Sequence, residues 1–402
     1  MKKRTFALTL AGVLTIGLLS GCGGGNEPTQ TPDADNTQTP GDSASAVTLQ
    51  IGGIGPLTGD AAIYGLATQW GAQVAVDQIN ALNGPIKLEY NFQDDTNDTE
   101  TSISAYNNLK DWGMDILYGC TTTAPCIAVA AETNADRYFQ LTPSGSSPDI
   151  TAGKDNAFQM CFTDPNQGVA AADYMKAKDL GTKVAVLYNN GDPYSTGVAQ
   201  GFIKHAGEID LDVVTEQTFP SDTNTDFNVQ LKACQDAGAD LVFMPIYYTP
   251  ASLVLAQADQ MGYKPLFFGA DGIDGILAIE GFDTKLTEGM MMMTPFNAAA
   301  TDERTVTFVK EFKALSNGVD PNQFAADGYD CMYAIYEAAQ KAGVTDEMTP
   351  EEICDAMIDV FTSGDFKMDG LTGTDMSWQT TGEVSKNPMV VVIKDGAYVT
   401  ME

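Results

Sequence analysis

The segment Tyr118 to Ser146, YGCTTTAPCIAVAAETNADRYFQLTPSGS, decides how the rest of the chain is organised. The apolar run Met114 to Leu117 predicts a buried strand that leads into it, and the threonine run 121–123 stands where a helix would begin. The first turn of a helix has unpaired N–H donors and the positive end of the helix dipole, so anions bind there. The segment therefore begins with a predicted anion-binding helix end.

A second predicted strand in this segment, Tyr138 to Leu141, runs directly into a hydroxyl-rich turn. The turn, TPSGS, would bring Ser144 and Ser146 to the carboxyl end of the strand. Open α/β sheets bind ligands at that edge. With the hydroxyls of Thr122 and Thr123 at the helix start, the segment predicts a site for a small carboxylate.

Composition limits the classes of protein to consider. The chain has 402 residues, of which 44% are hydrophobic, so it can bury a large core and is long enough for two domains. Lys and Arg number 21 against 54 Asp and Glu, a formal net charge of -33. Phosphate binding needs clustered basic residues, so nucleic acid is not an expected partner. The one histidine, His205, is predicted at an exposed helix position and gives little basis for histidine catalysis or zinc binding.

The cysteines form no metal-binding pattern. Cys22 stands apart from the other six, which are scattered: Cys120, Cys126, Cys161, Cys234, Cys331 and Cys354. Export would permit disulfides, but their pairing cannot be deduced from the sequence, and small buried thiols are an equal alternative.

Residues 1–22 form a predicted export signal. A basic start precedes an apolar stretch from Phe6 to Leu19, which is shorter than the roughly 20 residues that cross a bilayer as a helix. The ending LSGC resembles the bacterial lipoprotein box. The resemblance implies that residues 1–21 are a signal peptide, removed by cleavage, and that Cys22 then carries a lipid that anchors the protein to the membrane.

Residues 22–46 are rich in Gly, Pro, Thr, Asp and Ser and have almost no apolar side chains. Such a segment cannot offset its ordering entropy by burial, so we expect a flexible tether. About 25 residues of this kind have an end-to-end distance of roughly 25–30 Å, enough to hold a folded domain away from a membrane surface.

From Val47 onward, strand-like runs alternate with amphipathic helical segments. The predicted strands are VTLQIGG, IKLEYNF, MDILYG, RYFQLT, KVAVLYN, DLVFMPIYY, PLFFGAD and GMMMMTPF. This alternation predicts an α/β fold of parallel sheets covered by helices, and the number of strands favours two sheets. Three helical segments follow Phe296, and the end, Met376 to Val399, is predicted as strand and hairpin with Asp395-Gly396 as the turn.

Motifs that suggest cofactors or catalysis fit poorly. The glycine-rich run Gly52 to Gly59 has the wrong spacing for a dinucleotide loop, and Pro56 removes a backbone donor. The acidic run QDDTNDTE lacks the spacing of a calcium loop, and consecutive strand methionines at 290–293 alternate faces, so they cannot converge on copper. No GxSxG motif or cysteine with a histidine base is present. We therefore expect no cofactor, no metal and no enzyme activity.

Aromatic and polar residues recur at the carboxyl ends of predicted strands or just after them. They are Tyr194, Tyr247, Tyr248 and Asp271. With the hydroxyls of Thr123 and Ser146, they supply what a zwitterion needs, namely donors for a carboxylate, an anion for an ammonium group and aromatic walls for a side chain. Asp271 discriminates between ligands, because an acidic group facing an apolar cleft is unfavourable unless the ligand brings a cation.

These motifs together resemble the branched-chain amino-acid-type solute-binding proteins of ABC transporters, which have the type I periplasmic-binding-protein fold. The resemblance covers Val47 to Glu402. It is carried by IGGIGPLTGDAAIYG, GAQVAVDQINALNG, YGCTTTAP, LTPSGSSPDIT, YNNGDPYSTG, PIYYTPASLVLAQADQMGYKPLFFGADG and FAADGYDCMYAIYEA.

The resemblance implies two doubly wound parallel-sheet lobes joined by a hinge of three crossovers. The crossovers would fall near 162–167, 294–297 and 371–378. Lobe 1 would then comprise 47–164 plus 295–372, and lobe 2 would comprise 165–294 plus 373–402.

The resemblance also implies roles for individual residues. Thr123 would contact the ligand carboxylate, and Ser144 and Ser146 would bind the ammonium and carboxylate through a backbone carbonyl and a hydroxyl. Asp271 would pair with the ammonium. The aromatic lining would be Tyr64, Tyr194, Tyr247 and Phe324. The chain departs from some family members at Asn97, where those members have a cysteine that forms a disulfide with the site loop. This disulfide cannot form here, so the role of Cys120, in the site loop, stays open.

The function implied is capture of an α-amino acid, aliphatic or branched-chain, by closure of the two lobes, followed by docking on a membrane permease. We expect a monomeric, extracytoplasmic lipoprotein. The same fold also serves sensory ligand-binding modules, and family members bind amides, urea or aromatic acids, so signalling and these other ligands stay open as alternatives.

Overall fold

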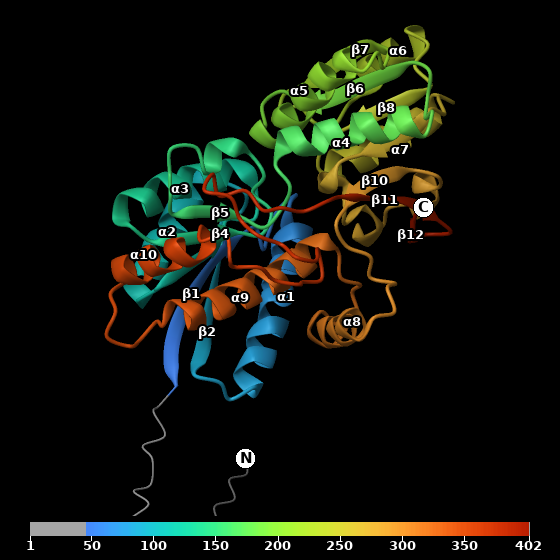
Figure 1. Ribbon diagram of the computed structural model, residues 1–402. Coiled ribbons are helices and arrows are strands. Elements are labelled where there is room, and N and C mark those ends of the chain that lie inside the picture. The colour runs from blue at the N-terminus through green and yellow to red at the C-terminus, as the bar shows by residue number, and fades with distance from the viewer. Residues whose placement is uncertain (1–45, 402) are drawn as a thin grey trace, which may run out of the picture. The chain divides into compact units, whose positions relative to one another are not determined.

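The computed structural model describes residues 46–401. The predicted signal peptide, the lipidation site Cys22 and nearly all of the predicted tether lie outside these described residues. Strands and helices alternate as the sequence predicted, and they form two separate sheets (Figure 1). Within residues 46–401, no helix is both long and apolar enough to cross a membrane.

The first sheet is entirely parallel, with the strand order β2-β1-β3-β4-β5. Its strands are β1 (Val47–Gly55), β2 (Ile86–Asp94), β3 (Ile116–Gly119), β4 (Phe139–Thr142) and β5 (Ala157–Gln159). All residues of β3 and β4 are buried. The sequence of β3, ILYG, is accordingly almost entirely apolar, while β4, FQLT, also buries the polar side chains of Gln140 and Thr142. The helices α1 (Ala62–Ala81), α2 (Thr99–Trp112) and α3 (Thr123–Asp136) connect these strands.

The second sheet has the strand order β12-β11-β10-β9-β8-β6-β7. Its parallel part consists of β6 (Val184–Asn189), β7 (Val213–Phe219), β8 (Leu241–Met244), β9 (Leu266–Gly269) and β10 (Met291–Thr294). The hairpin of β11 (Met389–Lys394) and β12 (Ala397–Thr400) adds two antiparallel strands at one edge. Its turn is Asp395-Gly396, as predicted, and both residues have positive φ, as a two-residue hairpin turn requires.

Four helices accompany the second sheet: α4 (Asp164–Ala177), α5 (Pro193–Glu208), α6 (Asn228–Asp236) and α7 (Tyr248–Gln260). We call this sheet with its helices lobe 2. The first sheet forms lobe 1 with α1–α3 and with three later helices, α8 (Glu303–Leu315), α9 (Gln323–Ala342) and α10 (Pro350–Phe361). α9 packs closely on α1, since a methyl group added to Gly71 would fall 1.9 Å from the carbonyl oxygen of Ala325.

Some strands differ from the prediction for local reasons. The predicted strand at 240–248 stops at Met244, because Pro245 cannot donate to the sheet, and Tyr248 instead begins α7. The strands β5 and β7 were not predicted. β5 has three residues, and β7, VVTEQTF, mixes polar and apolar side chains with little burial, so neither gives a strong period-two pattern.

The chain passes between the lobes three times. The first passage lies between β5 and α4, and the second lies between β10 and α8. The third lies later than the expected 371–378. The Trp378 indole donates to the Gln159 carbonyl (2.9 Å), and the Gln159 N–H donates to the Gly382 carbonyl (2.9 Å).

The predicted lobe boundary at 372/373 was therefore wrong, and the chain joins the second sheet only at Met389. The reason is that Trp378 packs on Phe361 and Phe366, with ring centroids 4.6 and 5.7 Å apart. These ring contacts hold the irregular segment around Trp378 against lobe 1.

Candidate ligand site

One cavity between the lobes collects all nine binding residues predicted from the sequence. Thr121 and Gly272 complete its lining, and the predicted residues are Tyr64, Thr122, Thr123, Ser144, Ser146, Tyr194, Tyr247, Asp271 and Phe324. The cavity measures about 20 Å³, which is room for one or two water molecules. A free amino acid is larger than this cavity.

The hydroxyl-bearing side of the cavity lies at the start of α3. Thr122 is the N-cap residue of this helix, but its hydroxyl caps nothing and is buried without a hydrogen-bond partner. The Thr123 hydroxyl accepts the Ser146 N–H at 3.2 Å and lies 3.4 Å from the Ser146 hydroxyl. The Ser144 hydroxyl donates to the Thr121 carbonyl at 2.5 Å. The helix end therefore offers free donors, and the serine turn is held against it.

The acidic side of the cavity is Asp271, which follows β9 and is 5% exposed. Its Oδ1 atom is buried without a hydrogen-bond partner, and its backbone N–H donates to the Gln167 side chain at 3.3 Å. Burial raises the pKa of Asp271 to about 6, against the opposing effect of the Tyr194 hydroxyl and the Gln167 side chain. No basic side chain lines this cavity within the described chain, so the carboxylate lacks a cation.

Aromatic rings also line the cavity. The Tyr64 ring lies 4.6 Å from Phe324 and 5.2 Å from Tyr247, and Tyr194 stacks on Tyr247 at 5.3 Å. The Tyr64 hydroxyl donates to the Gly272 carbonyl at 2.5 Å and accepts the Tyr248 N–H at 3.1 Å. Tyr64 belongs to lobe 1 and its partners belong to lobe 2, so these bonds hold the lobes together.

Asp164 is a second buried carboxyl group near the cavity that the sequence analysis missed. It is the first residue of α4, it is 0% exposed, and neither side-chain oxygen has a hydrogen-bond partner. Its backbone N–H donates to the Ser146 carbonyl at 2.9 Å. Burial holds the pKa of Asp164 well above its usual range, and the charge of Asp271 adds to this effect while the Ser146 hydroxyl opposes it. Its segment, FTDPNQ, was predicted only as a passage between the lobes.

We expect Asp164→Asn to stabilise the fold at pH 8. The pKa of Asp164 is higher in the folded protein than in the unfolded chain, so the folded protein keeps this carboxyl protonated to higher pH. The folded state therefore loses stability as the pH rises above about 4, where the unfolded chain releases the proton. Asparagine has the same size and no charge to bury. Urea unfolding at pH 4.5, 6 and 8 should show an advantage that grows with pH, while the exposed control Asp222→Asn shows none. A loss of stability equal at all three pH values would contradict this expectation.

The described residues give no sign of a metal or disulfide site. No group of three or more His, Cys, Asp or Glu within 46–401 could hold a metal ion. The six cysteines of this range are all buried free thiols. Burial, with Cys126 beside it, holds the pKa of the Cys120 thiol well above its usual range, so these thiols pack as small apolar groups.

A family model for the periplasmic binding protein matches residues 48–397. The chain belongs to this family. Periplasmic binding proteins of this kind bind solutes and are not enzymes, so this periplasmic binding protein is an extracytoplasmic solute-binding protein with the type I fold. Membership implies a small-molecule ligand and a membrane permease of an ABC transporter as partners.

Two relatives agree with this assignment. This periplasmic binding protein is 28% identical over 312 residues to Leu/Ile/Val-binding protein homolog 3 of Brucella melitensis, covering 76% of this chain and 82% of the relative. It is also 28% identical over 324 residues to the leucine-, isoleucine-, valine-, threonine- and alanine-binding protein of Pseudomonas aeruginosa, covering 78% and 83%.

Solved structures share the fold. One is the branched-chain amino acid transporter substrate-binding protein of Streptococcus pneumoniae in complex with isoleucine, with a TM-score of 0.77, 24% identity and coverage of 88% of this chain and 100% of that one. Another is a solute-binding protein of R. palustris in complex with benzoate, with a TM-score of 0.76, 19% identity and coverage of 88% and 95%. The same fold therefore holds ligands with and without an amino group.

Proposed function

We propose that this periplasmic binding protein captures an aliphatic α-amino acid, of the branched-chain type, between its lobes and delivers it to a permease. The observation that carries the proposal is the unpaired Oδ1 atom of Asp271, which lies in one cavity with the free hydroxyl of Thr122 at the α3 N-terminus. An anion-binding helix end and a carboxylate without a cation are complementary to the two charges of a zwitterion. Two relatives, each 28% identical to this chain, have names that include leucine, isoleucine and valine.

The aromatic rings support an apolar ligand side chain. Phe324, Tyr64 and Tyr247 line the cavity, and the Tyr64 ring contacts the rings of the other two. Among the described residues, no second acidic or basic side chain lines the cavity, so a charged ligand side chain would be left unpaired. An aliphatic side chain would instead displace water from these rings.

Entry of the ligand requires the lobes to separate. The cavity of about 20 Å³ is too small for an amino acid, and the Tyr64 hydroxyl is bonded to lobe 2. We propose that the open protein binds the ligand on the hydroxyls of lobe 1 first and that lobe 2 then closes, bringing Tyr194, Tyr247 and Asp271 onto it.

A thermal-shift screen of the soluble domain from Val47 tests the proposal. Ligands would be the standard amino acids, 4-methylpentanoate, benzoate, urea and simple amides. Binding to the folded state raises its stability by about 2.7 kcal/mol at a hundredfold excess over the dissociation constant. We expect shifts with leucine, isoleucine or valine. Shifts only with ligands that lack an ammonium group would reject the amino-acid proposal.

Ligand affinity should depend on pH through Asp271. The carboxyl has a raised pKa of about 6, and only its charged form can hold an ammonium group. Above about pH 7 the affinity is expected to be constant, and below pH 6 it should fall by up to about tenfold per pH unit, because a proton must leave before the ligand binds. Titration calorimetry with leucine between pH 4.5 and 8 measures this. A flat profile would show that Asp271 does not contact the ammonium.

We also propose that Cys22 carries a lipid that holds the protein at the cell membrane, as the LSGC sequence suggests. Metabolic labelling with a fatty acid should mark the wild-type protein and leave Cys22→Ser unlabelled. The variant should then appear in the soluble fraction, and labelling of Cys22→Ser would contradict the proposal.

A further inference from the structure

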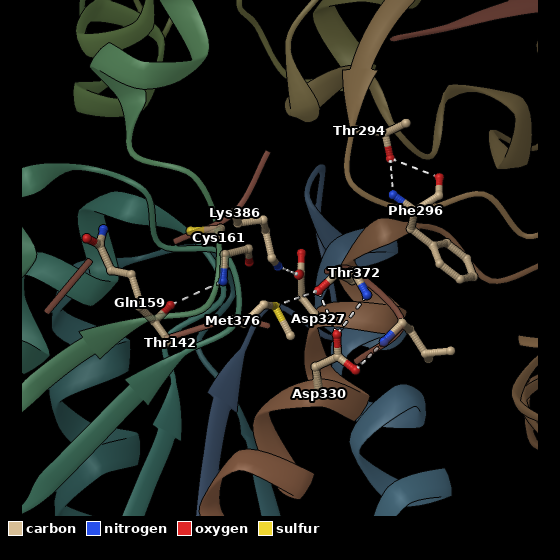
Figure 2. A network of polar contacts seen from close by, with 12 residues as sticks. Thr142, Gln159, Cys161, Thr294, Phe296, Asp327, Asp330, Thr372, Met376 and Lys386 are labelled. Atoms are coloured by element: carbon tan, nitrogen blue, oxygen red, sulfur yellow. Dashed lines mark hydrogen bonds and ion pairs between the residues drawn. The ribbon is translucent and has the colours of Figure 1, made fainter. Parts of the chain in front are cut away.

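Lys386 is a buried lysine at the point where the chain leaves lobe 1 for the last time. It lies three residues before Met389, the first residue of β11. Its side chain is 0% exposed, and its Nζ atom lies 2.7 Å from Oδ1 of Asp327, which is also buried (Figure 2). An ion pair removed from water often adds no more stability than apolar side chains of similar volume. Stability alone therefore gives no reason for a charged pair at this place.

The Lys386 ammonium group also contacts the first passage between the lobes. Its Nζ atom lies 5.9 Å from the centroid of the Phe162 ring, a distance at which an aromatic ring attracts a cation. Phe162 is 6% exposed and lies two residues before Asp164, where α4 of lobe 2 begins. The lysine side chain therefore joins the first and third passages where both leave lobe 1.

The second passage adjoins the other two. It begins after Thr294, the last residue of β10, and Thr294 pairs with Met389 of β11. Because Met389 is three residues from Lys386, all three passages come together near the buried ammonium group. Two lobes turn about the few residues that connect them. Lys386 therefore lies close to the axis about which these lobes would rotate.

The carboxylates that hold this region belong to a single helix, α9, which packs closely on α1. Asp327 pairs with Lys386, and Asp330 lies three residues further, on the same face of α9. The Asp330 carboxylate accepts the backbone N–H groups of Leu371 and Thr372 at 2.8 and 2.9 Å. One face of α9 therefore holds the irregular segment from Leu371 to Lys386 at both of its ends.

We propose that the Lys386–Asp327 pair is the pivot of lobe movement, which makes Lys386 a positioning residue for ligand capture although it does not line the ligand cavity. The ammonium group fixes the first and third passages against α9, so that Asp271 of lobe 2 closes onto lobe 1 in one register. A buried charged pair suits this role because its two groups must meet, which specifies one arrangement of the chain. The inference rests on the function proposed above.

Two double variants of the soluble Cys22→Ser protein test the pivot. Lys386→Met with Asp327→Asn removes both charges of the buried pair, so no unpaired charge is left to unfold the protein. Lys367→Met with Asp375→Asn is the matched control. It removes an exposed ion pair of 2.9 Å in the same irregular stretch between α10 and β11. Urea unfolding establishes that both variants are folded.

Spin labels at one exposed position in each lobe report how the lobes are placed. Asn108→Cys in α2 and Val229→Cys in α6 supply the positions, and the six cysteines of residues 46–401 are buried. Pulsed electron paramagnetic resonance then measures the distances between the labels without ligand. The wild type and the control should give the same distance distribution, and the buried-pair variant should give a broader one. Phe162→Leu, which removes only the ring contact, should broaden it less.

Leucine affinity, measured by titration calorimetry, is the second readout. It should be at least about tenfold weaker in the buried-pair variant, because a binding arrangement populated about one-tenth as often lowers the apparent affinity by that factor. The control should bind leucine as the wild type does. An unchanged distance distribution in the buried-pair variant, equal broadening in the control, or wild-type leucine affinity in the buried-pair variant would overturn the proposal. If the wild type itself does not bind leucine, only the function proposed for the cavity fails, because the distances without ligand still decide whether the pair is the pivot.

Discussion

Replacing Asp271 with alanine is expected to weaken leucine binding by about 2–5 kcal/mol, the range measured when one partner of a buried charge pair is removed. The physical reason is that the ligand ammonium would enter a buried cavity that no other carboxylate of the described chain lines. Titration calorimetry at pH 7.5 measures the change. Circular dichroism and urea unfolding of the variant without ligand establish that the fold is intact.

A ligand without the ammonium group separates pairing from general damage to the site. With Asp271→Ala, 4-methylpentanoate should bind more tightly than it does to the wild type, because the unpaired carboxylate that opposes it is gone. Asp271→Asn should show the same two changes, weaker binding of leucine and tighter binding of 4-methylpentanoate, to a smaller extent. If both variants bind leucine as the wild type does, Asp271 is not the ammonium partner, and if both lose all ligands equally, its role is to hold the site together.

Replacing Lys386 with methionine should destabilise the protein by about 3–5 kcal/mol, because it leaves a buried carboxylate uncompensated. Lys386 Nζ lies 2.7 Å from Asp327 Oδ1, and the two side chains are 0% and 3% exposed. Figure 2 shows this pair beside Asp330, whose carboxylate accepts the Thr372 N–H and hydroxyl at 2.9 and 2.6 Å. All other ion pairs among the described residues are partly or largely exposed.

The loss of stability caused by Lys386→Met should become smaller as the pH falls. Burial raises the pKa of Asp327 to about 7 even though Lys386 opposes the shift. Without the lysine its pKa would rise further, so protonation below pH 6 removes the unpaired charge. Urea unfolding at pH 6 and 8 tests this expectation.

Two variants serve as controls for the buried pair. Lys386→Met combined with Asp327→Asn should recover most of the stability, because no unpaired charge remains. Lys232→Met breaks an exposed ion pair with Asp236 and should change the free energy of unfolding by less than about 1 kcal/mol. Equal losses for Lys386→Met and Lys232→Met would show that burial adds nothing to the pair.

Features encoded by local patterns could be predicted from the sequence. Thr123, Ser146 and Asp271 all follow apolar runs, and parallel strands end at a common edge, so their meeting in one cavity followed from the fold class. Lipidation at Cys22 is a local pattern as well, and it stays a prediction because it lies outside the described residues.

Features that depend on distant contacts could not be predicted. Asp164 lies in a stretch that the sequence predicted only as a passage between the lobes, and the fold buries it without a partner. Lys386 lies in an irregular segment, and its partner Asp327 is 59 residues away. The same holds for Trp378, whose packing on Phe361 moves the third passage between the lobes beyond residue 382.

The order in which the chain visits its lobes means that lobe 1 is completed by a late segment of the chain. The rings of Phe139 and Phe158 in the first sheet are each covered by Phe361, at 5.0 Å. Phe361 follows Phe158 by about 200 residues, so this apolar face of the first sheet is covered only by a segment far along the chain. Chains cut short before Phe361 would leave the face open to other chains and are expected to aggregate.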